Sequence, residues 1–536
     1  MRVLFIYPNL NAEEGFNHGI AVLSGALTAR GHRTALININ EALYDVPTDE
    51  EVVERVRAFA PGMVAFSTMS QQYRHAVRLA CAIRRALPDV ALAVGGVHAL
   101  LCTEQVKADG IWDFIGVGEC DESFPELVDR FQAGDPAYRE VPNFCVRLPD
   151  GTYRHNPLGR YPRLENLPPE DYEIYDLDHM LSRKNGWQSV LTSRGCPYRC
   201  SYCFNRVVRD RYTAEAGEPP RAYLRHYPPD RVIDEVLRLR DRHPAIRTII
   251  FDDDLLTLNE DYCVELFERY AAAGVGLPFV LNAHVQAFGD RIARTLAQAG
   301  CLIVKFGVES GSDTLRRSVL RRFMSNDRIF EAFETCRRHG LHSSAFLMIG
   351  LPFETRATLD ETIDLMVRCR PGRMRWAIFF PFEGTESYAL AEAAGLIDRD
   401  KMRTMENYFC ASCLRFDPPT DLLIRKLQRT FHWFVNSRSG GAAAETYRPL
   451  VDEIDAMDLE QWMTVEPGIL TRDRQWSDRL LERGVRHYSI RYTEVMAVDS
   501  DYVLAERGRD KHKPVRAWRA SAEASDTADT GRESSP

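Results

Sequence analysis

Short apolar runs alternate with amphipathic stretches through residues 1–130. The amphipathic stretch 20–30 has helical periodicity and stops at Gly31, a typical residue just beyond a helix. Continuous apolar runs are typical of buried parallel strands, and strands that alternate with helices form a doubly wound α/β sheet. We therefore predict such a sheet, with strands at 2–7, 34–39, 63–67, 90–94 and 114–117 and helices at 20–30, 49–60 and 73–87.

The same alternation returns between residues 187 and 382. About six β/α units in succession predict a parallel, partly open (β/α)6 barrel, with its chemistry at the carboxyl ends of the strands. The predicted strands are 188–191, 248–251, 279–282, 303–307, 344–349 and 376–380.

The remaining segments lack this alternation. Turns at Asn156-Pro157 and Leu167-Pro168 indicate a connector, and the pattern beyond Gly395 is mainly helical, for example over 422–436. The end of the chain is rich in Arg, Ser, Asp and Ala, a composition typical of disorder. The predicted organisation is a sheet domain, a connector, the barrel, a helical cap and a disordered tail, at 1–130, 131–186, 187–390, 391–505 and 506–536.

Charge, apolar runs and cysteine content indicate which kinds of partner and which compartment to expect. The chain of 536 residues has a net charge of −9 and no long basic run, so a nucleic-acid partner is not indicated. No stretch approaches the ~18–20 apolar residues that span a bilayer, and the apolar run at the start is too short for a signal peptide. Thirteen cysteines in such a chain indicate reduced thiols, and so we expect a cytoplasmic protein.

Three of these cysteines stand at C-x3-C-x2-C spacing. Cys196, Cys200 and Cys203 follow the first predicted barrel strand, in a loop that contains Gly195 and Pro197. Thiolates suit iron, and three of them hold three corners of a [4Fe–4S] cluster while one iron stays open. The alternative is three ordinary core cysteines, since free cysteine is commonly buried. Only about 0.01 matches to this spacing are expected by chance, so we favour the cluster.

With Tyr202 directly before the third cysteine, this segment resembles the signature of the radical S-adenosylmethionine (AdoMet) enzymes. The resemblance implies that the open iron chelates the amino and carboxylate groups of AdoMet. One electron then cleaves the sulfonium and releases a 5′-deoxyadenosyl radical.

Polar residues follow the later barrel strands. They include an Asp252-Asp253-Asp254 run, whose alternative interpretation is a cluster favoured by a helix N-terminus. In the radical AdoMet family, segments at these positions contact AdoMet. The resemblance thus implies AdoMet contacts at Tyr202, Asp252, Asp253, Asn282, Glu309, Ser310 and Gly350.

The N-terminal sheet domain resembles the cobalamin-binding domain of the B12-dependent branch of this family. Two turns carry the likeness, Gly95-Gly96-Val97-His98 and Gly116-Val117-Gly118-Glu119. The likeness and the strand-end position imply cobalamin contacts at Asn9, Ser67, Thr68, Gly95, Gly96, His98, Gly118 and Glu119.

A D-x-H-x-x-G motif does not follow the first strand, which departs from many cobalamin domains. Cobalt would then be bound without a lower histidine. His18 and His98 are conceivable ligands, although a lone loop histidine is more often a hydrogen-bonding residue. No G-x-G-x-x-G follows that strand either, which disfavours a dinucleotide domain.

Two further motifs stay open. His284 at a strand end is a candidate general acid or base, and a structural hydrogen bond explains it equally well. Cys410 and Cys413 stand at C-x2-C spacing, but two cysteines do not complete a four-thiolate site, so we favour a structural role.

The resemblance implies a cobalamin-dependent radical AdoMet methyltransferase that transfers methyl from methylcobalamin to an unactivated carbon. We expect a small specialised metabolite as substrate and a one-electron donor such as flavodoxin or ferredoxin. One alternative is a B12-dependent cyclisation or rearrangement without methyl transfer, since fold does not fix the reaction. An alternative of a different class is a non-catalytic cobalamin or metal sensor.

Overall fold

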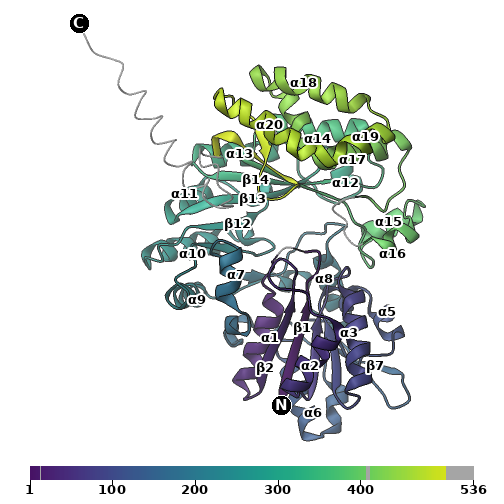
Figure 1. Cartoon of the computed structure of the whole chain (residues 1–536). Coiled ribbons are helices and arrows are strands. Elements are labelled where there is room, and N and C mark those ends of the chain that lie inside the picture. The colour runs from purple at the N-terminus through teal and green to yellow at the C-terminus, as the bar shows by residue number, and fades with distance from the viewer. Residues whose placement is uncertain (13, 406–410, 503–536) are drawn as a thin grey trace. The chain divides into compact units, whose positions relative to one another are not determined.

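The computed structural model describes residues 1–12, 14–405 and 411–502. The chain divides into two compact units, the first formed by 1–246 with 381–389 and the second by 247–380 with the rest of the chain. The described residues form two main sheets, one of seven strands and one of eight, which can be followed in Figure 1. The predicted disordered tail and Cys410 lie outside the described residues.

Unit 1 contains a seven-stranded sheet of order β2-β1-β3-β4-β5-β6-β7. The first five strands pair in parallel, as predicted. The strands are β1 (Arg2–Pro8), β2 (Arg33–Ile39), β3 (Met63–Ser67), β4 (Ala91–Gly95), β5 (Phe114–Gly116), β6 (Phe144–Arg147) and β7 (Tyr153–His155).

Helices cover both faces of this sheet, which confirms the doubly wound arrangement. One face packs mainly on α2 and α3, and the other packs on α1 and α6. The helices along the sheet are α1 (His18–Ala29), α2 (Asp49–Phe59), α3 (Tyr73–Ala86), α4 (Val97–Leu101), α5 (Thr103–Ala108) and α6 (Ser123–Ala133).

The predicted connector contributes two strands that the sequence analysis did not predict. β6 and β7 extend the sheet by antiparallel pairing, β6 with β5 and β7 with β6. Unit 1 continues with α7 (Leu177–Arg183), β8 (Trp187–Val190), β9 (Ser193–Arg194), α8 (Phe204–Ala216), β10 (Arg225–His226) and α9 (Pro229–Arg242). The cysteine loop therefore lies in the same unit as the first sheet.

Unit 2 contains the later barrel strands, joined in parallel in the order β11 to β15. They are β11 (Thr248–Phe251), β12 (Phe279–Ala283), β13 (Cys301–Glu309), β14 (His342–Ile349) and β15 (Arg373–Ile378). The helices between them are α10 (Glu260–Ala272), α11 (Asp290–Ala299), α12 (Asp313–Ser318), α13 (Asn326–Arg338) and α14 (Arg356–Cys369).

The C-terminal region is mainly helical, as predicted, but it also adds two antiparallel strands beyond β15. Its elements are α15 (Glu386–Ala393), α16 (Arg399–Thr404), α17 (Pro418–Arg438), α18 (Gly441–Ala456), α19 (Leu459–Val465), α20 (Ile469–Glu482), β16 (Tyr488–Ile490) and β17 (Met496–Asp499). Trp376 of β15 packs on Phe431 of α17 with ring centroids 5.3 Å apart, which joins this region to the strands.

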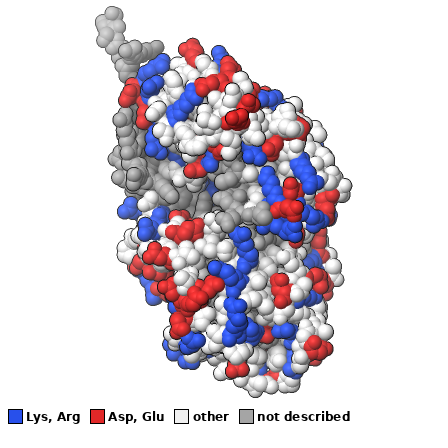
Figure 2. Space-filling view, turned by 45° about the vertical axis from the view of Figure 1, so that its right-hand side comes forward, with Lys and Arg blue, Asp and Glu red and all other residues white. Residues whose placement is uncertain are grey.

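No helix within the described ranges has the length and apolar character needed to cross a membrane. Basic and acidic side chains are interspersed over much of the face in Figure 2.

Candidate functional site

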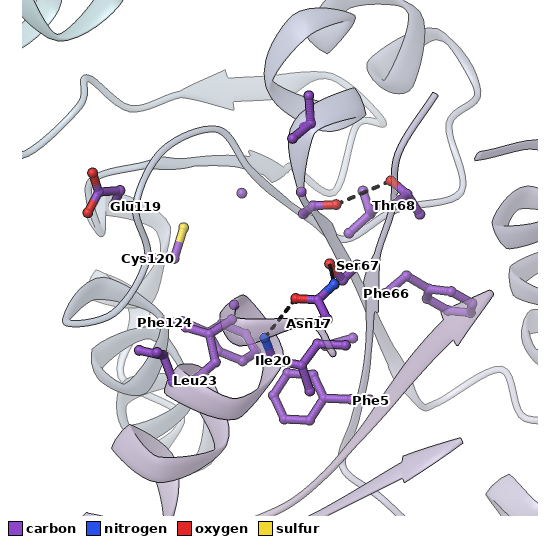
Figure 3. Close-up of a pocket in the computed structure, with 18 of the residues that line it drawn as sticks. Phe5, Asn17, Ile20, Leu23, Phe66, Ser67, Thr68, Glu119, Cys120 and Phe124 are labelled. Carbon is purple, nitrogen blue, oxygen red and sulfur yellow. Dashed lines mark hydrogen bonds between the residues drawn. The ribbon is translucent and has the colours of Figure 1, made fainter. Parts of the chain in front are cut away.

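A cavity of ≈ 430 Å³ lies in unit 1 near the carboxyl ends of its parallel strands. Its wall is largely apolar, with polar groups at the strand ends (Figure 3). A cavity of this size that combines an apolar wall with a few polar groups is typical of a small-molecule or cofactor site. The apolar lining residues include Phe5, Ile20, Leu23, Ala65, Ala93, Phe124 and Phe144.

Six of the eight residues predicted to contact cobalamin line this cavity, namely Ser67, Thr68, Gly95, Gly96, Gly118 and Glu119. The other two lie elsewhere. Asn9 is buried, and its backbone N–H donates to the carbonyls of Tyr7 and Ile39. His98 is buried beside Tyr73, with ring centroids 4.1 Å apart, and burial lowers its pKa to about 4.

The glycine pair shapes one wall. Gly96 has φ 93° and ψ −177°, a conformation essentially confined to glycine, and a Cβ there would lie 2.6 Å from the carbonyl oxygen of Thr68. A Cβ on Gly95 would meet no atom within 4 Å. Gly96 therefore lets β3 and β4 approach closely, while Gly95 leaves the space beside it open.

The start of α1 adds to the cavity wall beside Ser67. Asn17 caps this helix, and its side chain accepts from the N–H of Ile20 and donates to Ser67 Oγ (Figure 3). The next residue, His18, also lines the cavity. Its Nδ1 lies 2.7 Å from Glu170 Oε2 and its Nε2 lies 3.0 Å from Ser189 Oγ. A metal ligand needs one of these nitrogens, so His18 would have to give up a bond to bind cobalt.

The cysteine loop follows β8 and β9 and ends where α8 begins. Gly195 has φ 88°, and a Cβ there would lie 2.2 Å from the carbonyl oxygen of Tyr223, so only glycine fits. Arg209 of α8 is buried and donates to the carbonyl of Pro197 at 2.8 Å, which holds the loop against the helix.

The three cysteines differ in exposure. Cys200 is buried, whereas Cys196 and Cys203 are partly exposed. Among the described residues no three His, Cys, Asp or Glu side chains gather closely enough to hold a single metal ion. A [4Fe–4S] cube takes each thiolate on a different iron, so its three protein ligands do not have to meet at one ion.

The predicted AdoMet residues of unit 2 come after successive strands. Asp253 is fully buried while Asp252 is exposed, and Asn282 Nδ2 donates to the carbonyl of Asp253 at 3.0 Å. This bond joins the ends of β11 and β12, so the predicted residues Asp253 and Asn282 lie side by side. Glu309, the last residue of β13, has φ 67° at a bulge in the pairing of β13 with β14.

Ser310 and Gly350 have local roles. Ser310 is fully buried, and its hydroxyl accepts from the N–H of Ser312 and lies 3.3 Å from Thr362 Oγ1. The N–H of Gly350 donates to the buried carboxylate of Glu354. Burial raises the pKa of Glu354 to about 8. Tyr202 lies in unit 1, directly before Cys203, and is partly exposed.

His284 is buried after β12, and its Nδ1 accepts from the N–H of Gln286 at 3.2 Å. Burial, with Arg322 as a second cause, lowers its pKa to about 3. The ring is therefore neutral near pH 7, with the proton on Nε2, so it donates from Nε2 rather than accepting there. Cys413 is buried in unit 2, and burial raises its pKa to about 11.

Two family models match the chain. The B12 binding domain matches residues 12–128, and the Radical SAM superfamily matches residues 190–366. The first range contains most of the cavity wall, and the second begins just before the cysteine loop. The chain belongs to the cobalamin-dependent radical AdoMet family.

Among the relatives of the chain, one is named as a methyltransferase and another as a cyclase. The chain is 24% identical over 367 residues to the "Uncharacterized methyltransferase PH0819" of Pyrococcus horikoshii, covering 67% of this chain and 76% of the relative. It is 24% identical over 418 residues to the "Anaerobic magnesium-protoporphyrin IX monomethyl ester cyclase" of Rubrivivax gelatinosus, covering 75% and 72%.

A solved structure shares the fold. The cobalamin-dependent S-adenosylmethionine radical enzyme OxsB, with aqua-cobalamin and S-adenosylmethionine bound, is similar with a TM-score of 0.64 and 13% identity. The alignment covers 100% of this chain and 82% of that chain. The predicted fold and the predicted cofactors, namely cobalamin, AdoMet and a [4Fe–4S] cluster, are therefore confirmed.

The apolar wall of this cavity was not predicted. The missed residues include Phe5, Ile20, Leu23, Phe124 and Phe144. One signal for the cavity exists in the sequence: alanines alternate with larger residues on β3 and β4, at Ala65 and Ala93. Alternate residues of a strand share a face, so one face of this sheet carries small side chains next to its glycine turns.

Proposed function

We propose that this protein is a cobalamin-dependent radical AdoMet methyltransferase that methylates an unactivated carbon of a small specialised metabolite. The observation that carries the proposal is the cavity of the B12-binding domain, which lies in the same compact unit as the cysteine loop. Bound together, the three cofactors supply radical hydrogen abstraction and a transferable methyl group.

The side chains of unit 1 have distinct tasks in this proposal. Cys196, Cys200 and Cys203 hold the cluster, and Arg209 fixes their loop through the carbonyl of Pro197. The apolar side chains of the cavity wall bind the cobalamin and exclude water from it. His18 keeps its bonds to Glu170 and Ser189 in this proposal, so it would help to form the cavity wall rather than ligate cobalt.

In unit 2, the ends of β11 to β14 offer polar groups to AdoMet. Asp252, Asn282 and Glu309 are the candidate contacts with AdoMet. The bond from Asn282 Nδ2 to the carbonyl of Asp253 fixes the end of β11, and the bulge before Glu309 sets the backbone at the end of β13. The neutral His284 acts as a hydrogen-bond donor and does not take a proton from substrate.

We further propose a cytoplasmic location and a flavodoxin or ferredoxin as electron donor. A cluster that accepts one electron at a time needs such a carrier, and the thiol-rich composition fits a reducing compartment.

The test is anaerobic reconstitution of the full chain with iron, sulfide and cobalamin, followed by AdoMet and a strong one-electron reductant. Formation of S-adenosylhomocysteine together with 5′-deoxyadenosine supports methyl transfer. The C196A variant is the control, and it must lose 5′-deoxyadenosine formation if the cluster assignment holds.

Two other results would redirect the proposal. Release of 5′-deoxyadenosine without S-adenosylhomocysteine favours cyclisation or rearrangement, the reaction named for the Rubrivivax relative. Stoichiometric binding of cobalamin and AdoMet with no cleavage of AdoMet favours a sensor.

A further inference from the structure

Four charged side chains connect the wall of the cobalamin cavity with the cysteine loop. Glu119 and Asp121 follow β5 and line the cavity. Arg194 Nη1 lies 3.2 Å from Glu119 Oε2 and 2.9 Å from Asp121 Oδ1. Arg225 Nη2 lies 2.5 Å from Glu119 Oε1. Two cations and two anions thus form one network, which we call the clamp.

The clamp acts directly on the backbone before the cluster ligands. Arg194 is two residues before Cys196 and belongs to β9, which pairs with β10 through Arg225. One carboxylate, that of Glu119, therefore holds both strands of this short ribbon.

Neighbouring groups keep the clamp in place. The phenol of Tyr212 accepts from the N–H of Glu119 at 2.8 Å, and Asn143 Nδ2 donates to the Glu119 carbonyl at 2.6 Å. Arg225 also donates to the carbonyl of Pro162 at 3.1 Å. The backbone of Glu119 is thus fixed independently of its carboxylate.

Shielding from water strengthens the attraction between the charges of the clamp. The side chains of Glu119, Arg194 and Arg225 are 16–18% exposed and that of Asp121 is 7% exposed. Removing Glu119 leaves Arg225 without a carboxylate of the network, and removing Arg194 leaves Asp121 without a cation of the network. Such a loss is unfavourable for charges that are largely shielded from water.

We infer that the clamp fixes the cysteine loop on the wall of the cobalamin cavity, so that filling one cofactor site changes the affinity of the other. The identity of the two ligands rests on the proposed function. Glu119 and Arg194 are positioning residues for the cluster ligands, because they would act on the loop through their ion pair and not as ligands themselves. Coupling between two binding sites is reciprocal and commonly amounts to 5–150-fold, or about 1–3 kcal/mol.

The first experiment measures the loop without any cofactor. Hydrogen exchange is followed by mass spectrometry on the full cofactor-free chain, for peptides that cover residues 192–203. We expect about tenfold faster exchange there in E119Q and in R225Q. Arg225 does not line the cavity, so R225Q tests the clamp without changing the cavity wall.

The matched controls are E140Q and R154Q. They break the exposed pair of Arg154 with Glu140, 3.1 Å apart in the same unit, by the same chemical changes. Exposed ion pairs contribute little to stability, so in both control variants the peptides that cover 192–203 exchange at the wild-type rate. If these peptides of E119Q and R225Q exchange at the wild-type rate, the inference that the clamp holds the loop is wrong, whatever reaction the protein catalyses.

The second experiment measures coupling. The dissociation constant of cobalamin is determined for protein with and without the reconstituted cluster. We expect at least a fivefold ratio in the wild type and in R154Q, and a ratio within about twofold of one in R225Q. A merely structural role for Arg225 would leave this ratio unchanged, and that result overturns the inference. A wild type that binds no cobalamin refutes the proposed function instead, and the exchange experiment still decides the clamp.

Discussion

The adjacent glycines at the end of β4 separate the stability of the cobalamin domain from its ligand binding. Gly96→Ala and Gly95→Ala add the same single carbon at neighbouring positions. At Gly96 the new Cβ would lie 2.6 Å from the oxygen and 2.8 Å from the nitrogen of Thr68. At Gly95 it would meet nothing within 4 Å.

The magnitudes follow from these distances. Alanine at φ 93° and ψ −177° costs about 1–3 kcal/mol in backbone strain. Pushing Thr68 aside costs about 1–3 kcal/mol more, as in other overpacked sites. A loss of about 3 kcal/mol lowers the melting temperature of a domain of about 150–250 residues by about 6–12 °C. The G95A variant, by contrast, is strain-free and gains or loses less than about 1 kcal/mol.

Differential scanning calorimetry of the cofactor-free chain gives the melting temperatures, and a cobalamin titration gives the affinities. We expect G96A to melt at the lower temperature, and G95A to melt like the wild type but bind cobalamin more weakly, because Gly95 lines the cavity. The reasoning is refuted if G96A melts like the wild type, or if G95A loses as much stability as G96A.

Three further predictions follow from single side chains. Burial and the nearby Glu170 raise the pKa of Glu235 to about 7, so the folded protein holds a proton that the unfolded chain releases above pH ~4.3. The free energy of unfolding of the wild type therefore falls by up to about 3 kcal/mol as the pH rises from about 4.5 to 7. Scanning calorimetry at both pH values shows a smaller fall in E235Q. Nitrogen NMR of His284 shows the neutral Nε2–H form from about pH 5 to 8, because its pKa lies near 3; a titration in that range contradicts this. R209Q retains less iron after reconstitution, since the carbonyl of Pro197 loses its donor; equal iron content contradicts this role.

The regular strands were predictable and the short ones were not. The prediction for β11 was exact at 248–251, and the other parallel strands were found within a few residues, because a buried strand needs a continuous apolar run. β7 and β16 have three residues each. An antiparallel strand of that length at a sheet edge shows no apolar run of its own, and its place depends on the strand beside it.

The site shows a similar division. Glycine turns were visible in the sequence because Gly96 and Gly118 stand where strands end. Leu23 and Phe124 could not be found in this way, since each belongs to the apolar stripe of a helix and reaches the cavity only through the packing of α1 and α6 on the sheet. The partners of His18 come from residues 170 and 189, far along the chain, and only the fold brings them together.

The two faces of the first sheet explain why the cavity exists. On the face covered by α2 and α3, the strands present Phe66, Leu92 and Val94, and the interior is filled. On the face covered by α1 and α6, the same strands present Ala65 and Ala93, and the aromatic rings that surround them leave space toward the strand ends. Apolar side chains that line an open space lack the dispersion contacts of a packed core. A ligand that fills the space restores those contacts and, because it binds only the folded state, stabilises unit 1 by mass action. An apolar part of a bound cofactor would therefore complete this face of the domain, and the polar groups of the cavity lie at the strand ends beside it.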